Sequence, residues 1–221
     1  MLKKWLSYIL PITIHEKKSQ ISKNIEVTWN NGKLVIDSEN TNYSYGSLQK
    51  VLRSGLYSIG KQNIAKMNTI LVLGVAGGSV IKTLVDEFQF KGEITGVELD
   101  KEITAIANQY FKLNEITNYT PIIADANEFV KSTTENFDLI IIDIFQDATM
   151  PDFLFEKQFI SNVKELLNLK GFILFNTMNL DEKGINKNNR FIASFETSNY
   201  IIKEFKNIEV FNELILVEKI S

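Results

Sequence analysis

The sequence predicts an open α/β fold preceded by a small β-hairpin domain, and three observations support this prediction. After Asn68, short apolar runs alternate with amphipathic stretches, which is the pattern of buried parallel strands joined by helices. Near the end of the chain, two apolar runs are separated only by Asn212 and Glu213, a connection that can join antiparallel strands but not parallel ones. Before residue 47, the chain has the alternation and turn residues of a hairpin. We therefore expect a mostly parallel sheet that ends in an antiparallel hairpin.

The first part of the chain divides into two predicted units. Residues 1–20 are expected to form a separate segment, because the apolar stretch before Pro11 is too short for a signal peptide or a membrane span. It is expected to pack on the domain or on a partner, or to rest on a membrane surface. Residues 21–46 are expected to form the hairpin domain, with strands at 25–29 and 33–37 around Asn30-Asn31-Gly32. The α/β domain then occupies residues 47–221.

Within the α/β domain, each element follows from its hydrophobic period. Continuous apolar runs predict strands at 69–73, 94–98, 121–124, 137–143 and 171–175. Helical spacing predicts helices at 47–57, 79–88, 101–111, 127–132, 156–167 and 190–205. Residues 207–211 and 214–218 form the predicted terminal hairpin.

Composition excludes several classes of function. The chain has 221 residues, a net charge of −3, no cysteine and a single histidine, His15. Disulfide frameworks, thiolate metal sites and cysteine nucleophiles are therefore excluded, and a Ser-His-Asp triad is not expected. Acidic and basic residues are intermixed, so we expect no nucleic-acid partner, and no metal site is predicted. We expect a cytoplasmic protein that acts on a small molecule.

A glycine-rich turn follows the first strand of the α/β domain. Gly74, Ala76, Gly77 and Gly78 allow a sharp turn and a close approach of the backbone to a ligand, although such turns also occur without one. Their spacing is a poor match to the nicotinamide dinucleotide fingerprint, and no phosphate-binding GxxxxGK[ST] loop is present. The turn therefore favours a nucleoside ligand without a phosphate clamp.

Acidic residues end the next three strands, where ligands of open α/β sheets bind. Glu98 is placed to accept hydrogen bonds from ribose hydroxyls, or it is a solvated acid at a strand end. Asp125, followed by Ala126, is placed to accept from an adenine amine, to cap the following helix, or both. Asp143 ends a strand with apolar residues on both faces, so it would face the reacting end of a ligand unless it caps the next helix. Phe145 would form a wall of the pocket.

These residues resemble the class I S-adenosylmethionine-dependent methyltransferase fold, whose seven-stranded Rossmann-like sheet ends in an antiparallel hairpin. The resemblance lies in residues 71–78, 96–100, 124–126 and 137–143. More closely, the chain resembles the spermidine synthase family, through its N-terminal hairpins, residues 42–48, and the stretch from Asp143 through Pro151 to Leu154-Phe155. That family transfers an aminopropyl group from decarboxylated S-adenosylmethionine to putrescine.

The resemblance implies a role for each matching residue. Residues 74–78 would hold the sulfonium-bearing chain, Glu98 the ribose and Asp125 the adenine, while Asp143 would activate the attacking amine and Tyr45 would lie near it. Three positions differ from the family pattern. Gly77 replaces an acid that binds the amino end of the donor, Gly46-Ser47 replaces a His/Gln-Glu pair, and one extra residue separates Asp143 from Asp147.

These differences lead to three hypotheses of function. The first is a spermidine synthase-like transferase that binds S-adenosylmethionine or a close analogue and moves an alkyl group, most often methyl, to a small nucleophile. Asp143 would then orient that nucleophile, and Tyr43, Tyr45, Phe145 and Asp147 would contact it. The second is aminopropyl transfer from decarboxylated S-adenosylmethionine, and the third is an adenosyl-binding or scaffold protein without turnover. A nicotinamide dehydrogenase is disfavoured by the glycine spacing. The apolar side chains near Trp5 would suit a homodimer contact.

Overall fold

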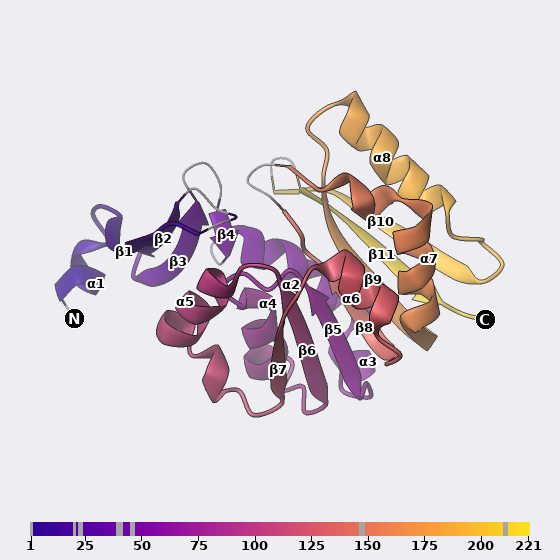
Figure 1. Ribbon diagram of the computed structural model, residues 1–221, viewed down its shortest axis with the longest axis horizontal. Helices are drawn as coiled ribbons and strands as arrows, with labels where there is room; N and C mark the ends of the chain where they lie inside the picture. The colour runs from indigo at the N-terminus through magenta and orange to yellow at the C-terminus, as the bar shows by residue number, and fades with distance from the viewer. Residues whose placement is uncertain are drawn as a thin grey trace.

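The computed structural model describes residues 2–19, 21, 24–38, 42–44, 47–145, 149–209 and 212–221. These residues form two β-sheets, which lie at different ends of the molecule (Figure 1). The smaller sheet has the strand order β1-β2-β3-β4 and is antiparallel. Its strands are β1 (Ile12–Lys17), β2 (Ile25–Asn30), β3 (Lys33–Ser38) and β4 (Asn42–Ser44).

The predicted N-terminal hairpin is present as β2 and β3. Its two turn residues, Asn31 and Gly32, have φ values of 48° and 73°, which is the left-handed backbone that a two-residue hairpin turn requires. Strand β1 lies within the segment predicted to stand apart, yet it pairs with β2 along its length. Before it, α1 (Leu2–Leu6) is a short helix. Among the described residues, no helix combines the length and the apolar character needed to cross a membrane.

The larger sheet has the strand order β10-β11-β9-β8-β5-β6-β7 and confirms the predicted fold class. The strands from β9 to β7 are parallel, and β11 runs antiparallel to both β9 and β10. The strands are β5 (Thr69–Leu73), β6 (Glu93–Glu98), β7 (Tyr119–Ile123), β8 (Phe137–Ile142), β9 (Leu167–Met178), β10 (Tyr200–Glu209) and β11 (Asn212–Lys219).

Helices cover both faces of this sheet, as a parallel sheet requires. The α-helices are α2 (Ser47–Ile59), α3 (Lys61–Ile64), α4 (Ser79–Lys82), α5 (Lys101–Phe111), α6 (Ala126–Ser132), α7 (Lys157–Leu166) and α8 (Glu182–Ala193). A π-helical turn, η1 (Thr83–Glu87), continues α4, and two 3-10 turns are η2 (Leu113–Glu115) and η3 (Asp152–Phe155).

The prediction of a helix at 190–205 is wrong. The last helix, α8, ends at Ala193, and the edge strand β10 already begins at Tyr200. The residues around Ile201 and Ile202 are apolar enough to fit a helical period, but they are β-branched and pair with Glu218 and Val217 of β11. Pairing with β11 therefore decides the structure here over the local pattern.

Three clusters of buried side chains hold the elements together. One lies between the large sheet and α2, α3 and α4, and the second lies on the other face under α6, α7 and α8. Helix α5 gives Ala107 to the first cluster and Ile103, Ile106 and Phe111 to a third, in which the small sheet packs through Ile25, Val27 and Ile36. The small sheet is thus fixed to the α/β domain through α5.

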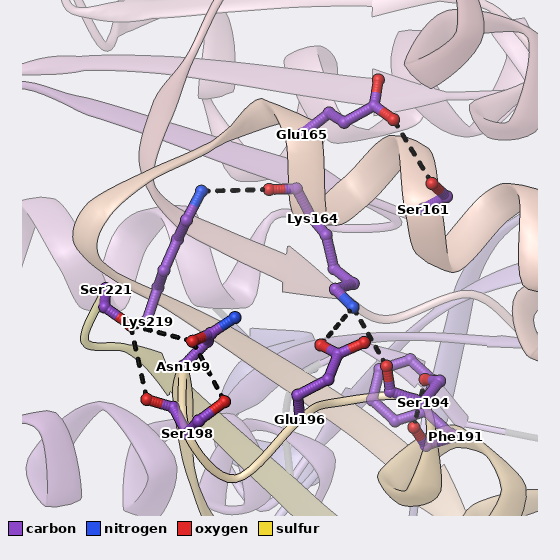
Figure 2. A network of polar contacts seen from close by, with 10 residues as sticks. All are labelled: Ser161, Lys164, Glu165, Phe191, Ser194, Glu196, Ser198, Asn199, Lys219 and Ser221. Carbon is purple, nitrogen blue, oxygen red and sulfur yellow. Dashed lines mark hydrogen bonds and ion pairs between the residues drawn. The ribbon is translucent and has the colours of Figure 1, made fainter.

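A polar network joins α7, the segment between α8 and β10, and the carboxyl end of β11 (Figure 2). The Lys219 ammonium donates to the carbonyl oxygen of Leu167 at 2.8 Å, at the end of α7. The Lys164 ammonium donates to the Ser194 carbonyl and pairs with the Glu196 carboxylate at 2.9 Å. Cations at helix ends stabilise the unpaired carbonyl groups there. This network ties α7 and the end of α8 to the terminal hairpin.

Candidate functional site

The carboxyl ends of five neighbouring strands lie side by side at one end of the large sheet. Across the neighbouring strands β9, β8, β5, β6 and β7, the carboxyl ends lie within two residues of Asn176, Asp143, Gly74, Glu98 and Asp125. The chain runs outward from β5 through β6 to β7 and then crosses to β8 on the other side of β5. Ligands of open α/β sheets bind at such a switch point. At about 4.8 Å between strands, the row from Asp143 to Asp125 is about 14 Å long, which suits an elongated ligand.

The glycine turn and Glu98 form one unit. The Glu98 Oε2 atom accepts the backbone N–H groups of Val75 at 3.1 Å and Ala76 at 3.0 Å. Its Oε1 atom accepts the N–H of Asp100 at 3.0 Å, and Asp100 in turn caps α5 through the Glu102 N–H. The Glu98 carboxylate therefore holds the turn that follows β5 in shape. The turn was predicted from the sequence, but these hydrogen bonds from its backbone to Glu98 were not.

These hydrogen bonds limit how Glu98 can hold a ribose. A carboxylate has about four acceptor positions, and three of them are used by the backbone. To accept hydrogen bonds from both ribose hydroxyl groups, Glu98 would have to lose its hydrogen bond to one of these backbone N–H groups. Burial raises the pKa of Glu98 above its usual range, while the three backbone hydrogen bonds oppose this rise and the charge of Asp100 adds to it. Burial, followed by the charge of Glu98, also raises the pKa of Tyr119.

Asp143 lies where β8 passes the glycine turn. Its N–H donates to the Leu73 carbonyl at 2.8 Å. Gly74 has φ +85°, and a Cβ at that position would collide with the carbonyl oxygen of Asp143, so only glycine fits there. Burial raises the pKa of Asp143 to about 6; the hydrogen bond from Asn176 lowers it, and the charge of Glu98 raises it. Two carboxylates that repel each other in this way favour a cationic ligand near them.

Asn176 and Asn212 are two site residues that the sequence did not reveal. The Asn176 amide donates to Asp143 Oδ1 at 2.8 Å, and its own Oδ1 accepts from the Asn212 amide at 3.1 Å. Asn176 is 1% exposed and Asn212 is 6% exposed. Asn176 directly follows the apolar run of β9, which was expected to end at Phe175, and Asn212 was expected to lie in a hairpin connection but is the first residue of β11. The two amides orient the Asp143 carboxylate.

Asp125 caps the helix that follows it, which confirms one of the two roles predicted for it. Its Oδ1 atom accepts the N–H of Asn127 at 2.8 Å and that of Glu128 at 3.1 Å, at the start of α6. The cap uses one carboxylate oxygen and still has acceptor capacity for an amine. Ala126 is buried in the core cluster under α6. The adenine role of Asp125 and the ligand contact of Ala126 stay predictions.

The predicted acceptor side is described only in part. Tyr45 and Asp147 lie outside the described residues, as does the side chain of Tyr43 in β4. Phe145 is half-buried two residues after Asp143. In the turn, Ala76 has φ +46° and Gly78 has φ +75°, and Gly77 is buried between them. The contacts of these residues with a ligand stay predictions.

The side chains that converge here suit a nucleoside that carries positive charge. They are carboxylates and amides, which accept hydrogen bonds from hydroxyl and amine groups and attract a sulfonium or ammonium ion. The turn from Gly74 to Gly78 contains no lysine or arginine for a phosphate. Among the described residues, no group of acidic or histidine side chains is arranged to hold a metal ion.

Two features define the class of this protein: the strand order, in which the antiparallel strand β11 lies between β9 and β10, and the acidic residues at the strand ends. The fold is that of the class I S-adenosylmethionine-dependent methyltransferases. Within this class, residues 49–202 match the model of the spermine/spermidine synthase domain. The chain therefore belongs to the spermine/spermidine synthase family.

Three known proteins illustrate the relationship. A probable polyamine aminopropyl transferase of Bifidobacterium longum is 32% identical over 117 residues, which cover 53% of this chain and 25% of that protein. An N-terminal histidine N-methyltransferase of Emericella nidulans is 35% identical over 111 residues, which cover 48% of this chain and 18% of that protein. A spermidine synthase solved in complex with the transition-state analogue AdoDATO has a TM-score of 0.71 and 17% identity, over 94% of this chain and 72% of its own. The matched part spans at most a quarter of the two curated relatives.

Proposed function

We propose that the protein transfers an aminopropyl group from decarboxylated S-adenosylmethionine to a primary amine. The observation that carries this proposal is the pair of half-buried carboxylates, Glu98 and Asp143, on either side of the glycine turn, with no cation in that turn. Both the donor and the amine acceptor are cationic, and a negative site lowers the free energy of binding for each. Family membership and the aminopropyl transferase of B. longum support the same reading.

The donor would lie along the row of strand ends. Asp125 would accept a hydrogen bond from the adenine amine, and Glu98 would accept one from a ribose hydroxyl. The sulfonium would then lie over the turn from Gly74 to Gly78. In this arrangement the reacting carbon would lie at the Asp143 end of the row, since β5 and β8 are neighbours.

Asp143 would act on the acceptor. The nitrogen of a neutral amine attacks the carbon next to sulfur, a C–N bond forms, and the C–S bond breaks with its electron pair going to sulfur. The products are methylthioadenosine and a secondary ammonium ion. Amines are protonated at neutral pH, so the acceptor must first lose a proton, and a carboxylate with a pKa of about 6 can accept it transiently. Most of the rate would come from in-line positioning of the two reactants.

Methyl transfer, which the sequence suggested first, is the second candidate. It is favoured by Gly77, which stands where the family carries an acid for the amino end of the donor, and by the relative of E. nidulans. The two reactions use donors that differ by one carboxylate. A carboxylate near Glu98 and Asp143 would be repelled, and this favours the decarboxylated donor.

A product assay distinguishes the candidates. The protein is incubated with each donor and with putrescine or a longer diamine, and products are identified by mass spectrometry. We expect methylthioadenosine and an aminopropylated amine from the decarboxylated donor. S-adenosylhomocysteine with a methylated amine would establish the second candidate instead. Tight binding of both donors without any product would support the scaffold hypothesis.

Substitutions of Asp125 separate its two roles. Asp125→Ser keeps a side chain that caps α6 but lacks the carboxylate, whereas Asp125→Ala loses both. We expect both variants to bind methylthioadenosine about ten-fold more weakly in calorimetry, because each loses a hydrogen bond to the adenine amine. Only Asp125→Ala should also lose about 1 kcal/mol of folding stability. Unchanged affinity in Asp125→Ser would remove the adenine assignment.

Asn176→Ala tests how the Asp143 carboxylate is held. The variant loses the hydrogen bond that lowers the pKa of Asp143, so the acidic limb of the pH–rate profile should move to higher pH. The matched control is Asn188→Ala, which removes an equally buried amide that bonds Thr177 and Glu213 instead. We expect its acidic limb to stay in place. A shift of the same size in both variants would mean that Asn176 has no specific role at Asp143.

A further inference from the structure

An apolar face of the first described segment is turned toward solvent. Its five members recur at the spacing of one helical face and are 74%, 71%, 46%, 79% and 68% exposed, in the order Leu2, Trp5, Leu6, Ile9 and Leu10. The first three lie in α1, and the other two lie in the turn that extends it, where both N–H groups donate to the Leu6 carbonyl. We call this set the apolar face.

The opposite side of the segment attaches it to the protein. Ser7 is 2% exposed, and its Oγ accepts the N–H of Gly32 at 3.0 Å while its carbonyl accepts the N–H of Asn31 at 3.0 Å. The ring of Tyr8 packs where a Cβ of Gly32 would lie. The segment is thus fixed to the β2–β3 turn by its polar side, the reverse of an ordinary surface helix. Apolar patches that a fold keeps exposed indicate interaction sites.

The charge around the apolar face is positive, although the whole chain carries −3. Lys3 and Lys4 lie in α1, and Lys33 follows the turn that holds Ser7. Residues 2–15 and 27–36 contain no aspartate or glutamate. The segment also lies at the end of the molecule far from the large sheet (Figure 1). A second copy joined by a two-fold axis would bring the same lysines together, which disfavours self-association here.

We propose that the apolar face binds to the surface of an anionic lipid membrane. Its tryptophan and aliphatic side chains would enter the headgroup region while Lys3, Lys4 and Lys33 contact anionic headgroups, as in other basic amphipathic segments that lie on membranes. This binding is peripheral, and it does not depend on the transfer reaction.

Tryptophan fluorescence gives a direct test, because the chain has two tryptophans and Trp29→Phe makes Trp5 the sole reporter. With vesicles in which about a third of the phosphatidylcholine is replaced by phosphatidylglycerol, we expect Trp5 emission to shift to the blue and the protein to sediment with the vesicles. Vesicles of phosphatidylcholine alone should bind far less, and about 1 M salt should release the protein.

Variants identify the surface. Trp5→Ser with Ile9→Ser should weaken binding about ten-fold or more, and Lys3→Gln with Lys33→Gln about five-fold per lysine. The matched controls are Leu169→Ser, at a leucine that is 60% exposed, and Lys66→Gln with Lys91→Gln, and these should bind as the parent does. Unshifted Trp5 emission with anionic vesicles would overturn the proposal. So would a dimer in light scattering that the Trp5→Ser, Ile9→Ser variant abolishes, since this would assign the face to a second copy.

Discussion

Asp143→Asn is expected to slow aminopropyl transfer by a factor of about 10²–10⁴, the usual loss when a positioned base is removed. The substitution keeps the shape of the side chain, and its Oδ1 can still accept from the Asn176 amide, so the geometry of the strand end is preserved. What disappears is the negative charge and the ability to accept a proton. Steady-state kinetics with the decarboxylated donor would measure this loss in kcat.

The same substitution should stabilise the fold above pH 6. In the native protein the pKa of Asp143 is raised from 3.8 to about 6, so the folded state holds its proton more tightly than the unfolded state does. The stability that this group contributes is therefore fully present below about pH 4 and is lost as pH rises through about 6. The asparagine side chain of the variant carries no charge at any pH. At about pH 7.5 the variant should be more stable by at most about 3 kcal/mol, and the difference should vanish near pH 4.

Kinetics and denaturation together make this prediction specific. A variant that is both slower and more stable at neutral pH is expected only if a half-buried carboxylate with a raised pKa is kept for the reaction at a cost in stability. If Asp143→Asn retains full activity, the residue is not the base. If it is inactive but less stable at every pH, Asp143 has a structural role instead.

Glu98→Gln is expected to abolish most of the affinity for adenosyl ligands, with a loss of about ten- to one-hundred-fold in calorimetry. Glu98 would hold the ribose, and it also shapes the turn through the N–H groups of Val75 and Ala76. Glutamine has one acceptor oxygen in place of two, and its NH₂ group cannot pair with those donors. The turn should therefore be less ordered in the variant even without a ligand.

Glu102→Gln is the matched control for this change. Glu102 is a nearby acid on α5 that pairs with Lys17 rather than with the turn. The Glu102→Gln variant should bind methylthioadenosine as tightly as the parent protein does. Equal affinity of the parent and Glu98→Gln would show that the ribose does not lie at this strand end.

The strand ends of the site could be predicted because their placement depends only on the parallel topology. Once β5, β6 and β8 are parallel neighbours, Gly74, Glu98 and Asp143 must share one edge, whatever the loops do. The terminal hairpin was also predicted, but its connection was placed wrongly: Asn212 and Glu213 lie in β11, where they pair with Met178 and Thr177 of β9. In each case a short apolar run predicts a strand, and the direction of that strand fixes where its ends lie in the sheet.

The remainder depends on contacts between distant parts of the chain. Asn176 reaches Asp143 only because β9 lies beside β8 and extends three residues beyond its expected end. The strand at β10 forms because β11 lies beside it, so the local helical period was misleading there. The hydrogen bonds of Glu98 to the turn depend on the path of the backbone through Ala76, which no residue pattern specifies.

The pH dependence of ligand binding tests the central claim most directly. Calorimetric titrations of the parent protein would compare decarboxylated S-adenosylmethionine, which is cationic, with methylthioadenosine, which is neutral. Because Asp143 loses most of its charge below pH 6, the cationic ligand should bind about ten-fold more weakly at about pH 5 than at about pH 7.5, while the affinity of the neutral ligand should change little. Failure of both ligands to bind, or the same pH dependence for both, would contradict an adenosyl sulfonium site built on Glu98 and Asp143.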